Sequence, residues 1–584
     1  MIGRSISERN WILSKFDDNK VKKISQEFGI SEILSRLLTI RGINPEKCHN
    51  FLNPRLKNCM PNPFSLKSMD KATDLMIKHI KKKSKICIFG DYDVDGASSS
   101  SMLGKFLKHF NCNFFIFIPD RVKDGYGPTL KTFEEIINKE VELIITVDCG
   151  TTAFEAIDFA KKKDVDVIII DHHQSSEILP NTPAIVNPNR FDETSDLTYL
   201  CAAGVSFMFL SSIITALRKE KYFEIQSLAE PDLLSYLDLV ALGTVCDVVP
   251  LIELNRAFVY QGLKVIAGRS NIGIKTLADT SNINTKISTY HLGYILGPKI
   301  NAGGRIGKAD FGTNLLITDD PEIAFSISSE LNILNEKRKS IENIMLEEAI
   351  ILAKKKDNNP IIVLTSNAWH EGVIGIIASR LKDHFNKPIL LIYFDGEQGK
   401  GSARSVPGFD IGKAVVKCKQ LNLITKGGGH KMAAGFSINK NKLEEFELSM
   451  INLFNKSGCQ SSKENDLYID TILSASAINE DFFEEIDKLA PFGSSNREPR
   501  FVIENIQIIK TILLKEIHIK AVCKTDNGLS INLISFNSVN TIIGTYLLNS
   551  KNKKYNIAGR LSLNEWNGKK EVQFLLDDIA LSEN

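Results

Sequence analysis

Hydrophobic and polar residues alternate along this chain with two different periods, and the period changes at a few positions. Apolar residues recur at helical spacing over 19–55 and 71–81, which predicts short amphipathic helices there. From Lys85 onward, apolar runs of strand length alternate with helix-length segments. This βαβ rhythm predicts a parallel sheet with strands at 85–90, 113–118, 142–147 and 165–170.

The second half of the chain repeats this alternation and then changes to short strands. A charged stretch over 321–356 predicts one long connecting helix, and a second α/β rhythm runs from 361 to a Gly-rich turn at 426–435. After about residue 460, short alternating runs are separated by turn signals such as DNG and WNGKK. About five such strands predict a small barrel of the oligonucleotide-binding (OB) type.

These patterns predict an α/β protein in five parts. The 584 residues exceed the size at which a single hydrophobic core stops growing, so several domains are expected. They are an N-terminal helical segment (1–70), a parallel-sheet domain (71–320), the connecting helix (321–356), a second α/β domain (357–458) and an OB-type β-barrel (459–584).

Composition and charge exclude several classes of protein. The formal net charge is only +2, so any basic surface for nucleic acid has to be local. The ten cysteines form no C-x-x-C pair, which fits a reduced, cytoplasmic compartment and argues against a zinc site or a disulfide framework. The first residues lack the apolar run of a signal peptide, and the longest apolar stretches are too short to span a membrane.

Three aspartates follow the first predicted strand at alternating positions. The string DYDVDG places Asp91, Asp93 and Asp95 directly after residues 85–90. Residues two apart in extended backbone face the same way, so these carboxylates are expected to converge on one spot. Such a cluster repels itself unless protons or cations neutralise it. A solvated turn is one alternative. An EF-hand calcium loop is another, but a strand precedes the string and its twelfth position is Met102.

Two further predicted strands end in an acid. Asp148 follows 142–147, and Asp171 follows 165–170 and is itself followed by His172 and His173. Ligands of open parallel sheets bind outside the carboxyl ends of the strands, so three strands are expected to bring acids to one edge. A single strand-end aspartate is usually a helix cap. Carboxylate oxygens together with imidazole nitrogen are a ligand set that suits manganese or magnesium.

One more acid lies in an apolar segment. Asp247, in ALGTVCDVVPL, needs a partner, which either a metal ion or an ordinary buried salt bridge would supply. With Asp148 as a bridging ligand, two cations about 4 Å apart would support hydrolysis of a phosphodiester. The sequence contains no Walker A motif, so phosphoryl transfer from ATP is not indicated.

The region before the predicted barrel is locally basic. Residues 400–440 carry eight Lys or Arg and a single acid, Asp410, a balance that suits a phosphate backbone. Gly427, Gly428 and Gly429 would let a phosphate approach backbone N–H groups. Taken alone, each feature has an ordinary explanation, a solvated surface for the charges and a flexible turn for the glycines.

Eight motifs together resemble a known family. DYDVDG, TVDCG (146–150), DHH (171–173) and GTVCDVVPL (243–251) resemble the four motifs of the DHH phosphoesterases in order and approximate spacing. The resemblance continues through DGYGPT (124–129), LGPKINAGGRIG (296–307), GSARS (401–405) and GGGHKMAAGF (427–436). It covers essentially the whole chain and is strongest to the exonucleases of this family.

The resemblance implies roles for particular residues. Five match the metal ligands of the family: Asp93, Asp95, Asp148, His172 and Asp247. Three match positions that support the metals or contact the scissile phosphate: Asp91, Asp171 and His173. For the nucleic acid, Arg305 matches a position that contacts the backbone. Ser402 and Arg404 match positions that recognise a 5′ end. The Gly-rich motif adds His430 and the three glycines Gly427, Gly428 and Gly429 as candidate contacts. Arg121, just before DGYG, is a further candidate phosphate contact.

By this resemblance we expect a monomeric exonuclease that uses two Mn²⁺ or Mg²⁺ ions to degrade single-stranded DNA from the 5′ end to mononucleotides, in repair and recombination. A single-strand-binding protein and a helicase would be its partners. One alternative is a phosphoesterase for very short oligoribonucleotides or cyclic dinucleotides, against which the predicted barrel argues. Another is a nucleic-acid-binding scaffold with an inactive site, which would have lost the metal ligands that are present here.

Overall fold

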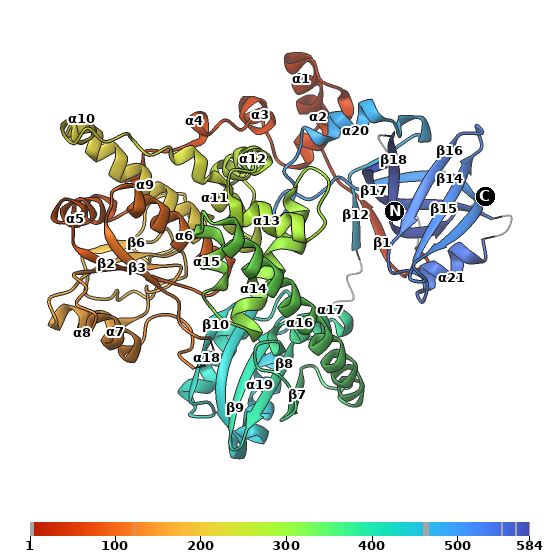
Figure 1. Cartoon of the computed structure of the whole chain (residues 1–584). Coiled ribbons are helices and arrows are strands. Elements are labelled where there is room, and N and C mark those ends of the chain that lie inside the picture. The colour runs from red at the N-terminus through yellow and green to blue at the C-terminus, as the bar shows by residue number, and fades with distance from the viewer. Residues whose placement is uncertain (1–4, 122, 460–465, 551–552, 567–568, 583–584) are drawn as a thin grey trace. The chain divides into compact units, whose positions relative to one another are not determined.

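The computed structural model describes residues 5–121, 123–459, 466–550, 553–566 and 569–582. They form two compact units (Figure 1). The first, here called the two-sheet unit, comprises residues 61–249 and 262–463. The second, the barrel unit, comprises residues up to 60, residues 250–261 and the chain from 464 onward. Helix α12 (Glu253–Ala267) contributes residues to both.

The first sheet of the two-sheet unit is fully parallel. Its order is β3-β2-β4-β5-β6. The strands are β2 (Lys85–Gly90), β3 (Asn113–Phe117), β4 (Leu143–Val147), β5 (Asp166–Ile170) and β6 (Ala184–Val186). The chain leaves β2 for β3 on one side and then crosses to β4 on the other, which creates a topological switch point between β2 and β4. A ligand crevice is therefore expected at the carboxyl ends of these two strands.

Helices cover both faces of this sheet. Figure 1 shows α7 (Leu130–Ile137) and α8 (Phe154–Lys162) on one side, where they share a core with Cys87, Phe89 and Ile144. The other side carries α5 (Met69–Lys82), α6 (Val94–His109), α9 (Ala202–Lys219) and α11 (Leu237–Cys246). Within the described chain, α9 alone has the length and apolar composition to cross a membrane, but most of it is buried and it serves as a core helix.

A helical region joins the two sheets of this unit. Its elements are α13 (Ile272–Thr280), the π-helix η3 (His291–Leu296), α14 (Gly297–Ile306), α15 (Phe311–Ile317) and α16 (Pro321–Lys355). The long helix α16 has the bounds that the charged pattern predicted. It begins at Pro321 because the Asp320 side chain accepts hydrogen bonds from two first-turn amides and the proline lacks an N–H to satisfy.

The second sheet is mixed, in the order β10-β11-β9-β8-β7. It contains β7 (Ile362–Ser366), β8 (Ile389–Asp395), β9 (Gln398–Arg404), β10 (Lys426–His430) and β11 (Ala433–Asn439), and only the β7–β8 pair is parallel. Helix α17 (Ile374–Phe385) packs on one face, and α18 (Ile411–Gln420) and α19 (Leu443–Lys456) pack on the other. The predicted Gly-rich turn at 426–435 is mostly wrong: only residues 431–432 form a turn, which joins β10 to the start of β11, with Gly428 paired to Gly435.

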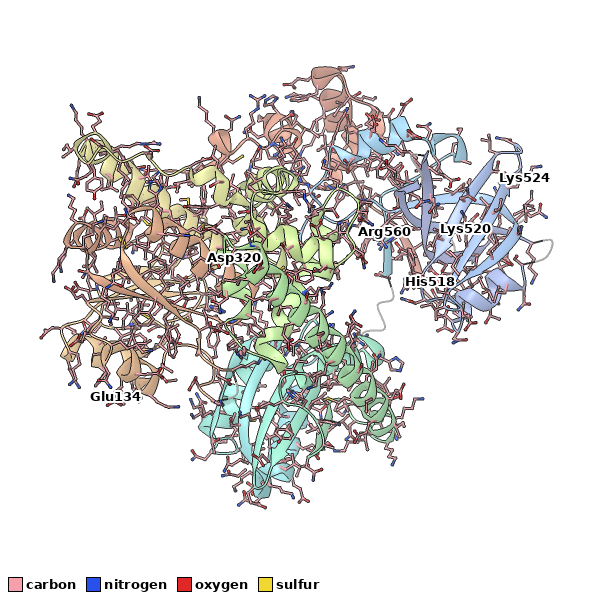
Figure 2. The ribbon with its side chains drawn as sticks, in the orientation of Figure 1. Glu134, Asp320, His518, Lys520, Lys524 and Arg560 are labelled. Atoms are coloured by element: carbon pink, nitrogen blue, oxygen red, sulfur yellow. The ribbon has the colours of Figure 1, made fainter. Side chains whose placement is uncertain are left out.

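The barrel unit confirms the predicted OB-type fold. Strands β14 (Phe501–Leu514), β15 (His518–Thr525), β16 (Ser530–Ser535), β18 (Lys569–Leu581) and β17 (Lys554–Trp566) pair in that order, and β17 pairs again with β14 to close the barrel. Along β15, buried Ile519, Ala521 and Cys523 alternate with Lys520, Val522 and Lys524, of which the two lysines are labelled in Figure 2. This strand therefore turns an apolar side inward and a basic side outward.

The N-terminal residues belong to the same unit as the barrel. Strand β1 (Asn10–Leu13) pairs with β12 (Asp466–Ile469), and the indole of Trp11 donates a hydrogen bond to buried Asp578 at 2.8 Å. Side chains of α1 (Asp18–Phe28), α2 (Glu32–Ile40) and α3 (Pro45–Leu52) share a hydrophobic core with barrel strands. The local periodicity predicts these helices, but it does not predict that they share a core with residues more than four hundred positions away.

Candidate active site

Acidic side chains gather at the carboxyl ends of three neighbouring strands. Asp91 follows β2, Asp148 follows β4 and Asp171 follows β5, and the sheet order makes these strands adjacent. They lie at the switch point, where a parallel sheet offers a crevice. The geometry therefore brings the acids to one edge, as the sequence pattern led us to expect.

The potential ligand atoms form three overlapping groups, which we call the carboxylate cluster. Within each group the atoms lie within 4.8 Å of one another; the groups are Asp91–Asp93–Asp148, Asp148–His172–His173 and Asp95–His172–Asp247. His172 Nε2 lies 3.2 Å from Asp148 Oδ1 and 3.6 Å from Asp247 Oδ2. Because Asp148 and His172 are each shared between groups, the cluster offers two adjoining positions for a cation.

Asp93 and Asp95 reach the cluster by a different route from the one expected. The structure starts helix α6 at Val94, with Asp93 as its N-cap: Asp93 Oδ1 accepts from the amides of Asp95 (2.9 Å) and Gly96 (3.0 Å). Asp95 is thus helical, and the argument from alternation in an extended strand is wrong for it. Its carboxylate accepts instead from the amides of Ala202 (2.6 Å) and Ala203 (2.9 Å) at the start of α9. The helical path also excludes an EF-hand loop over 91–102.

Asp148 is held in a strained backbone conformation. Its φ is +61°, in the left-handed region that side-chain-bearing residues seldom adopt, and such strain concentrates at functional sites. Among the residues that the structure describes, Oδ1 of Asp148 and Oδ1 of Asp91 are buried and accept no hydrogen bond of normal geometry, although His172 Nε2 lies 3.2 Å from the first. Buried carboxylate oxygens without a donor are costly, and a cation is the partner that such oxygens would take.

Burial and mutual repulsion explain the electrostatics of the cluster. Burial, with the charge of Asp93 next in size, raises the pKa of Asp91 and Asp148 well above their usual range. The same two causes raise the pKa of Asp95 to about 7, while burial together with Asp95 and Asp93 raises that of Asp247 to about 9. Burial lowers the pKa of His172 to about 4, so its imidazole is neutral at pH 7, as a metal ligand must be. The donor set and the unpaired oxygens therefore fit divalent cations.

Asp171 and His173 form a hydrogen-bonded pair beside the cluster. Asp171 Oδ1 accepts from His173 Nδ1 at 2.8 Å, and its Oδ2 accepts from the Thr151 amide at 3.0 Å. Burial disfavours the charged form of both side chains, but the hydrogen bond between them and their opposite charges outweigh the effect of burial. They lower the pKa of Asp171 and raise the pKa of His173 to about 9. His173 is thus a positioned cation at the rim of the carboxylate cluster.

A residue that the motifs did not single out connects this pair to Asp148. The Tyr126 hydroxyl donates to the backbone carbonyl of Asp148 at 3.0 Å and lies 3.0 Å from His173 Nδ1. Tyr126 lies within the DGYGPT motif, which was the available signal, but its partner could not be inferred without the tertiary structure.

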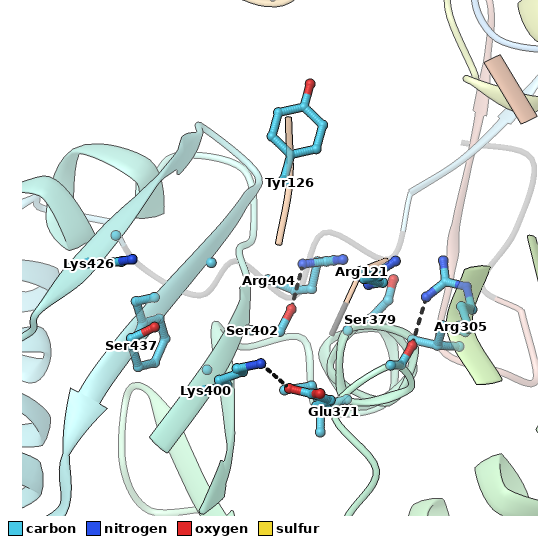
Figure 3. A pocket seen from close by; sticks show the side chains of 18 of the residues that line it. Arg121, Tyr126, Arg305, Glu371, Ser379, Lys400, Ser402, Arg404, Lys426 and Ser437 are labelled. Atoms are coloured by element: carbon cyan, nitrogen blue, oxygen red, sulfur yellow. Dashed lines mark hydrogen bonds and ion pairs between the residues drawn. The ribbon is translucent and has the colours of Figure 1, made fainter. Parts of the chain in front are cut away.

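A basic pocket of about 690 Å³ adjoins the cluster (Figure 3). Five of the eight predicted nucleic-acid contacts line it: Arg121, Arg305, Ser402, Arg404 and Gly427. The other three do not: Gly428, Gly429 and His430 lie further along β10. Lys400 and Lys426, which belong to the basic stripe, also line the pocket, together with Glu371, Ser379 and Ser437.

Strand alternation explains why the pocket is basic. Lys400, Ser402 and Arg404 are two residues apart on β9 and therefore share one face. Arg404 Nη1 donates to Ser402 Oγ at 3.1 Å and to the Ala403 carbonyl at 2.8 Å. From the opposite wall, Arg305 Nη1 donates to the Gly372 carbonyl at 3.0 Å (Figure 3).

Burial and a neighbouring positive charge lower the pKa of two arginines of the pocket. Burial, followed by the charge of Arg121, lowers the pKa of Arg404, and the same causes lower that of Arg305 to about 10. Crowded, partly desolvated guanidinium groups of this kind are suited to an anion such as a phosphate.

Two tyrosines link the pocket to the cluster. Tyr92 lies between Asp91 and Asp93 in the sequence, and its ring centroid is 5.1 Å from the Arg121 guanidinium. Tyr126 lines the same pocket and is hydrogen-bonded to Asp148. The basic pocket, here called the anion pocket, and the carboxylate cluster are therefore two parts of one site.

A parallel sheet with this cluster, followed by a mixed sheet with an anion pocket, defines a DHH-family phosphoesterase. The model of the DHH family N-terminal domain matches residues 85–244, that of the DHHA1 domain matches 335–456, and that of the RecJ OB domain matches 469–578. The chain belongs to the RecJ family.

Its relatives cover nearly its whole length. It is 31% identical to the single-stranded-DNA-specific exonuclease RecJ of Bacillus subtilis, over 99% of this chain and 71% of the relative. It is 32% identical to the Salmonella typhimurium protein of the same name, over 94% of this chain and 95% of the relative. The crystal structure of RecJ in complex with Mn²⁺ from Thermus thermophilus is similar with a TM-score of 0.81 and 25% identity, over 99% of this chain and 80% of that one. These similarities confirm the family resemblance and the fold class.

Proposed function

We propose that this chain is a metal-dependent exonuclease that hydrolyses single-stranded DNA in the 5′-to-3′ direction to mononucleotides. One observation carries the proposal: Tyr92 and Tyr126 line the anion pocket and join it to the carboxylate cluster, Tyr92 as the residue between Asp91 and Asp93 and Tyr126 through its hydrogen bond to Asp148. A terminal phosphate held in the pocket would place the next phosphodiester at the cluster. The Bacillus subtilis and Salmonella typhimurium relatives are single-stranded-DNA-specific exonucleases by name, which supports the same substrate.

The cluster would hold two divalent cations, Mn²⁺ or Mg²⁺, the ions named for two Thermus thermophilus RecJ structures. Asp93, Asp95, Asp148, His172 and Asp247 would be their ligands, and Asp148 the residue shared between the two positions. Such ions, bound there, would supply the activation of a water molecule and the stabilisation of the leaving oxygen. The residues of the chain supply the rest, by binding and orienting the strand and by placing protons.

Asp171 and His173 would act on the scissile phosphate. Asp171 accepts the Nδ1 proton of His173 and so fixes the orientation of the imidazolium. The cation of His173 would then bind a non-bridging oxygen of the phosphate. Asp91, buried beside Asp93 and without a protein donor on Oδ1 among the described residues, would support the metal ion held by Asp93 and Asp148.

The pocket would bind the 5′ end of the strand. Ser402 and Arg404 would hold the terminal phosphate, with Arg121 completing its charge, and Arg305 would hold the backbone beside it. The Gly427 backbone allows a close approach of the phosphate. Contacts to Gly428, Gly429 and His430 stay a prediction, for nucleotides that lie outside the pocket.

Several wider features complete the proposal. The basic outer side of β15 would add a second contact with the strand and favour processivity. A single-strand-binding protein and a helicase would be partners, and the chain would act as a cytoplasmic monomer in repair and recombination. The five-part domain division also stays a prediction, with residues 1–70 and the barrel sharing the core described above.

The test is one single-stranded oligonucleotide labelled separately at each end, incubated with Mn²⁺, Mg²⁺ or EDTA. Early release of a mononucleotide from the 5′ label only, with a duplex left intact, is the expected result. Degradation from the 3′ end, or activity confined to dinucleotides, would instead favour a short-oligonucleotide phosphoesterase. The absence of metal-dependent cleavage would leave a binding scaffold as the explanation.

A further inference from the structure

Two exposed tyrosines form a stacked pair outside the pocket. Tyr290 is 59% exposed and Tyr294 is 75% exposed. Their ring centroids lie 5.4 Å apart with an interplanar angle of 27°. Large rings usually bury their faces, so a pair left open to solvent offers a surface to a partner. Tyr294 lies within the π-helix η3, and Tyr290 directly precedes it. π-Helical turns are rare in proteins, and those that occur are often found at functional sites.

The π-helix is fixed to the residues that carry the carboxylate cluster. Cys246 Sγ donates to the Leu292 carbonyl at 3.4 Å, and a Cβ on Gly293 would lie 3.4 Å from the Val245 side chain. A Cβ on Gly297 would lie only 2.5 Å from Cys246 Sγ, so glycine is required for this close packing. Val245 and Cys246 end α11, and the next residue is Asp247. The tyrosine pair therefore lies at the start of and within an element that packs against the two residues preceding a predicted metal ligand.

The same helical segment reaches the anion pocket at its other end. Helix α14 continues directly from η3. A Cβ on Gly304 would lie 2.8 Å from the Tyr92 carbonyl, and the next residue, Arg305, lines the pocket. The segment thus passes the cluster from Asp247 to Tyr92. Eleven residues separate Tyr294 from Arg305, which at 1.5 Å per helical residue is about 17 Å.

We propose that Tyr290 and Tyr294 form a base-stacking platform for single-stranded DNA on the 3′ side of the scissile phosphate. This inference rests on the proposed function, because it takes the 5′ end to be in the pocket. A span of about 17 Å corresponds to about five nucleotides at the 3.4 Å spacing of a stacked strand, and to fewer in an extended one. The platform would therefore contact bases roughly three to five positions from the 5′ end.

The chemistry of stacking suits an enzyme that must accept every sequence. Each base has a π-face, so an aromatic platform binds the strand without reading its sequence. It would also keep the strand in line with the cluster while the terminal nucleotide leaves and the next one enters the pocket. The phenolic hydroxyls are not required for this role, which separates it from a hydrogen-bonding role.

The test compares Y290A/Y294A with Y290F/Y294F and with F325A, which removes an exposed aromatic ring from α16. Binding of a 5′-phosphorylated 12-mer is measured in EDTA by fluorescence anisotropy. The set of 12-mers includes one with an abasic site at each position in turn. Cleavage of the 12-mer and of a 5′-phosphorylated dinucleotide, which is too short to reach the platform, is measured with Mn²⁺.

We expect the double alanine variant to bind the 12-mer about tenfold more weakly, and Y290F/Y294F and F325A to bind like the wild type. In the wild type, an abasic site near positions three to five should weaken binding, and this penalty should disappear in Y290A/Y294A. The ratio of kcat/KM for the 12-mer to that for the dinucleotide should fall about tenfold in the same variant.

Unchanged 12-mer binding, a persisting abasic penalty or equal losses on both substrates would overturn the platform. Equal losses of kcat/KM on the two substrates would mean that the tyrosines stabilise the packing of η3 and do not bind the DNA strand. A wild type that cleaves neither substrate would contradict the proposed function itself, so the two failures are distinguishable.

Discussion

The Tyr126 hydroxyl donates a hydrogen bond to the carbonyl oxygen of Asp148 at 3.0 Å. Asp148 has a φ of +61°, so this bond stabilises a backbone conformation that costs free energy. It also joins a wall of the anion pocket to the centre of the carboxylate cluster.

Replacing Tyr126 by phenylalanine should therefore impair catalysis more than substrate binding. Loss of one hydrogen bond of about 1 kcal/mol would let Asp148 relax, which should lower kcat about fivefold and raise the Mn²⁺ concentration needed for half-maximal activity. Steady-state kinetics over a Mn²⁺ titration measures both effects. If the variant matches the wild type in kcat and in Mn²⁺ dependence, the bond has no part in positioning Asp148.

Replacing Asp148 by asparagine should abolish cleavage and leave DNA binding largely intact. The substitution removes the shared ligand of the two cation positions, while the pocket residues are untouched. Metal content by mass spectrometry and oligonucleotide binding in EDTA would measure the two properties separately.

The same variant should be more stable than the wild type when metal is absent. Burial and repulsion by Asp93 and Asp95 disfavour the Asp148 carboxylate, and asparagine removes that charge. A higher Tm in EDTA is expected, and a lower Tm would show that Asp148 has a protein partner after all.

Replacing Arg404 by alanine should weaken the preference for a 5′-phosphorylated end. Arg404 is half-buried in the pocket and hydrogen-bonded to Ser402, so its charge is placed for a terminal phosphate. We expect the ratio of kcat/KM for phosphorylated and hydroxyl-ended oligonucleotides to fall at least tenfold. The matched control is Lys413→Ala, which removes a charge of the same basic stripe whose side chain is 85% exposed. An unaltered preference in the Arg404 variant would place the 5′ pocket elsewhere.

Asp238 should make the two-sheet unit less stable as the pH rises. The side chain is buried in α11, and burial raises its pKa to about 6, above the value of about 4 expected in the unfolded chain. An acid whose pKa is higher in the folded protein than in the unfolded chain adds to the free energy of unfolding at a pH below its unfolded pKa. This contribution is lost as the pH rises through the folded pKa of about 6. Asp238→Asn should therefore stabilise the protein by roughly 1–2 kcal/mol at pH 8 and by much less near pH 4. Urea unfolding at both values measures the difference, and an equal effect at the two would exclude a titrating Asp238.

The sequence predicts most of the frame of the active site. Strands β2, β4 and β5 have strong apolar runs, and the rule that parallel strands end at a common edge then brings Asp91, Asp148 and Asp171 together. The long helix α16 was equally predictable, since its charged periodic pattern is uninterrupted and its cap is local.

Other features depend on contacts that no local pattern records. Asp95 is held by amides of α9, more than a hundred residues away, and Tyr126 is held by Asp148. The glycines of β10 predict a turn because they have no side chains to alternate, and it is the pairing with β11 that makes this segment extended. Pairings of this kind are decided by the packed fold.

The two α9 amides that bind Asp95 have a consequence for metal exchange. A carboxylate oxygen has room for both an amide and a cation, so these bonds hold Asp95 in place before, during and after occupancy. If the metal ions were removed, the residues around the site would keep their positions, and metal could bind again without refolding. A site of this kind can bind its metal ions after the protein has folded, and it can take the divalent ion that is available in the cell at that time.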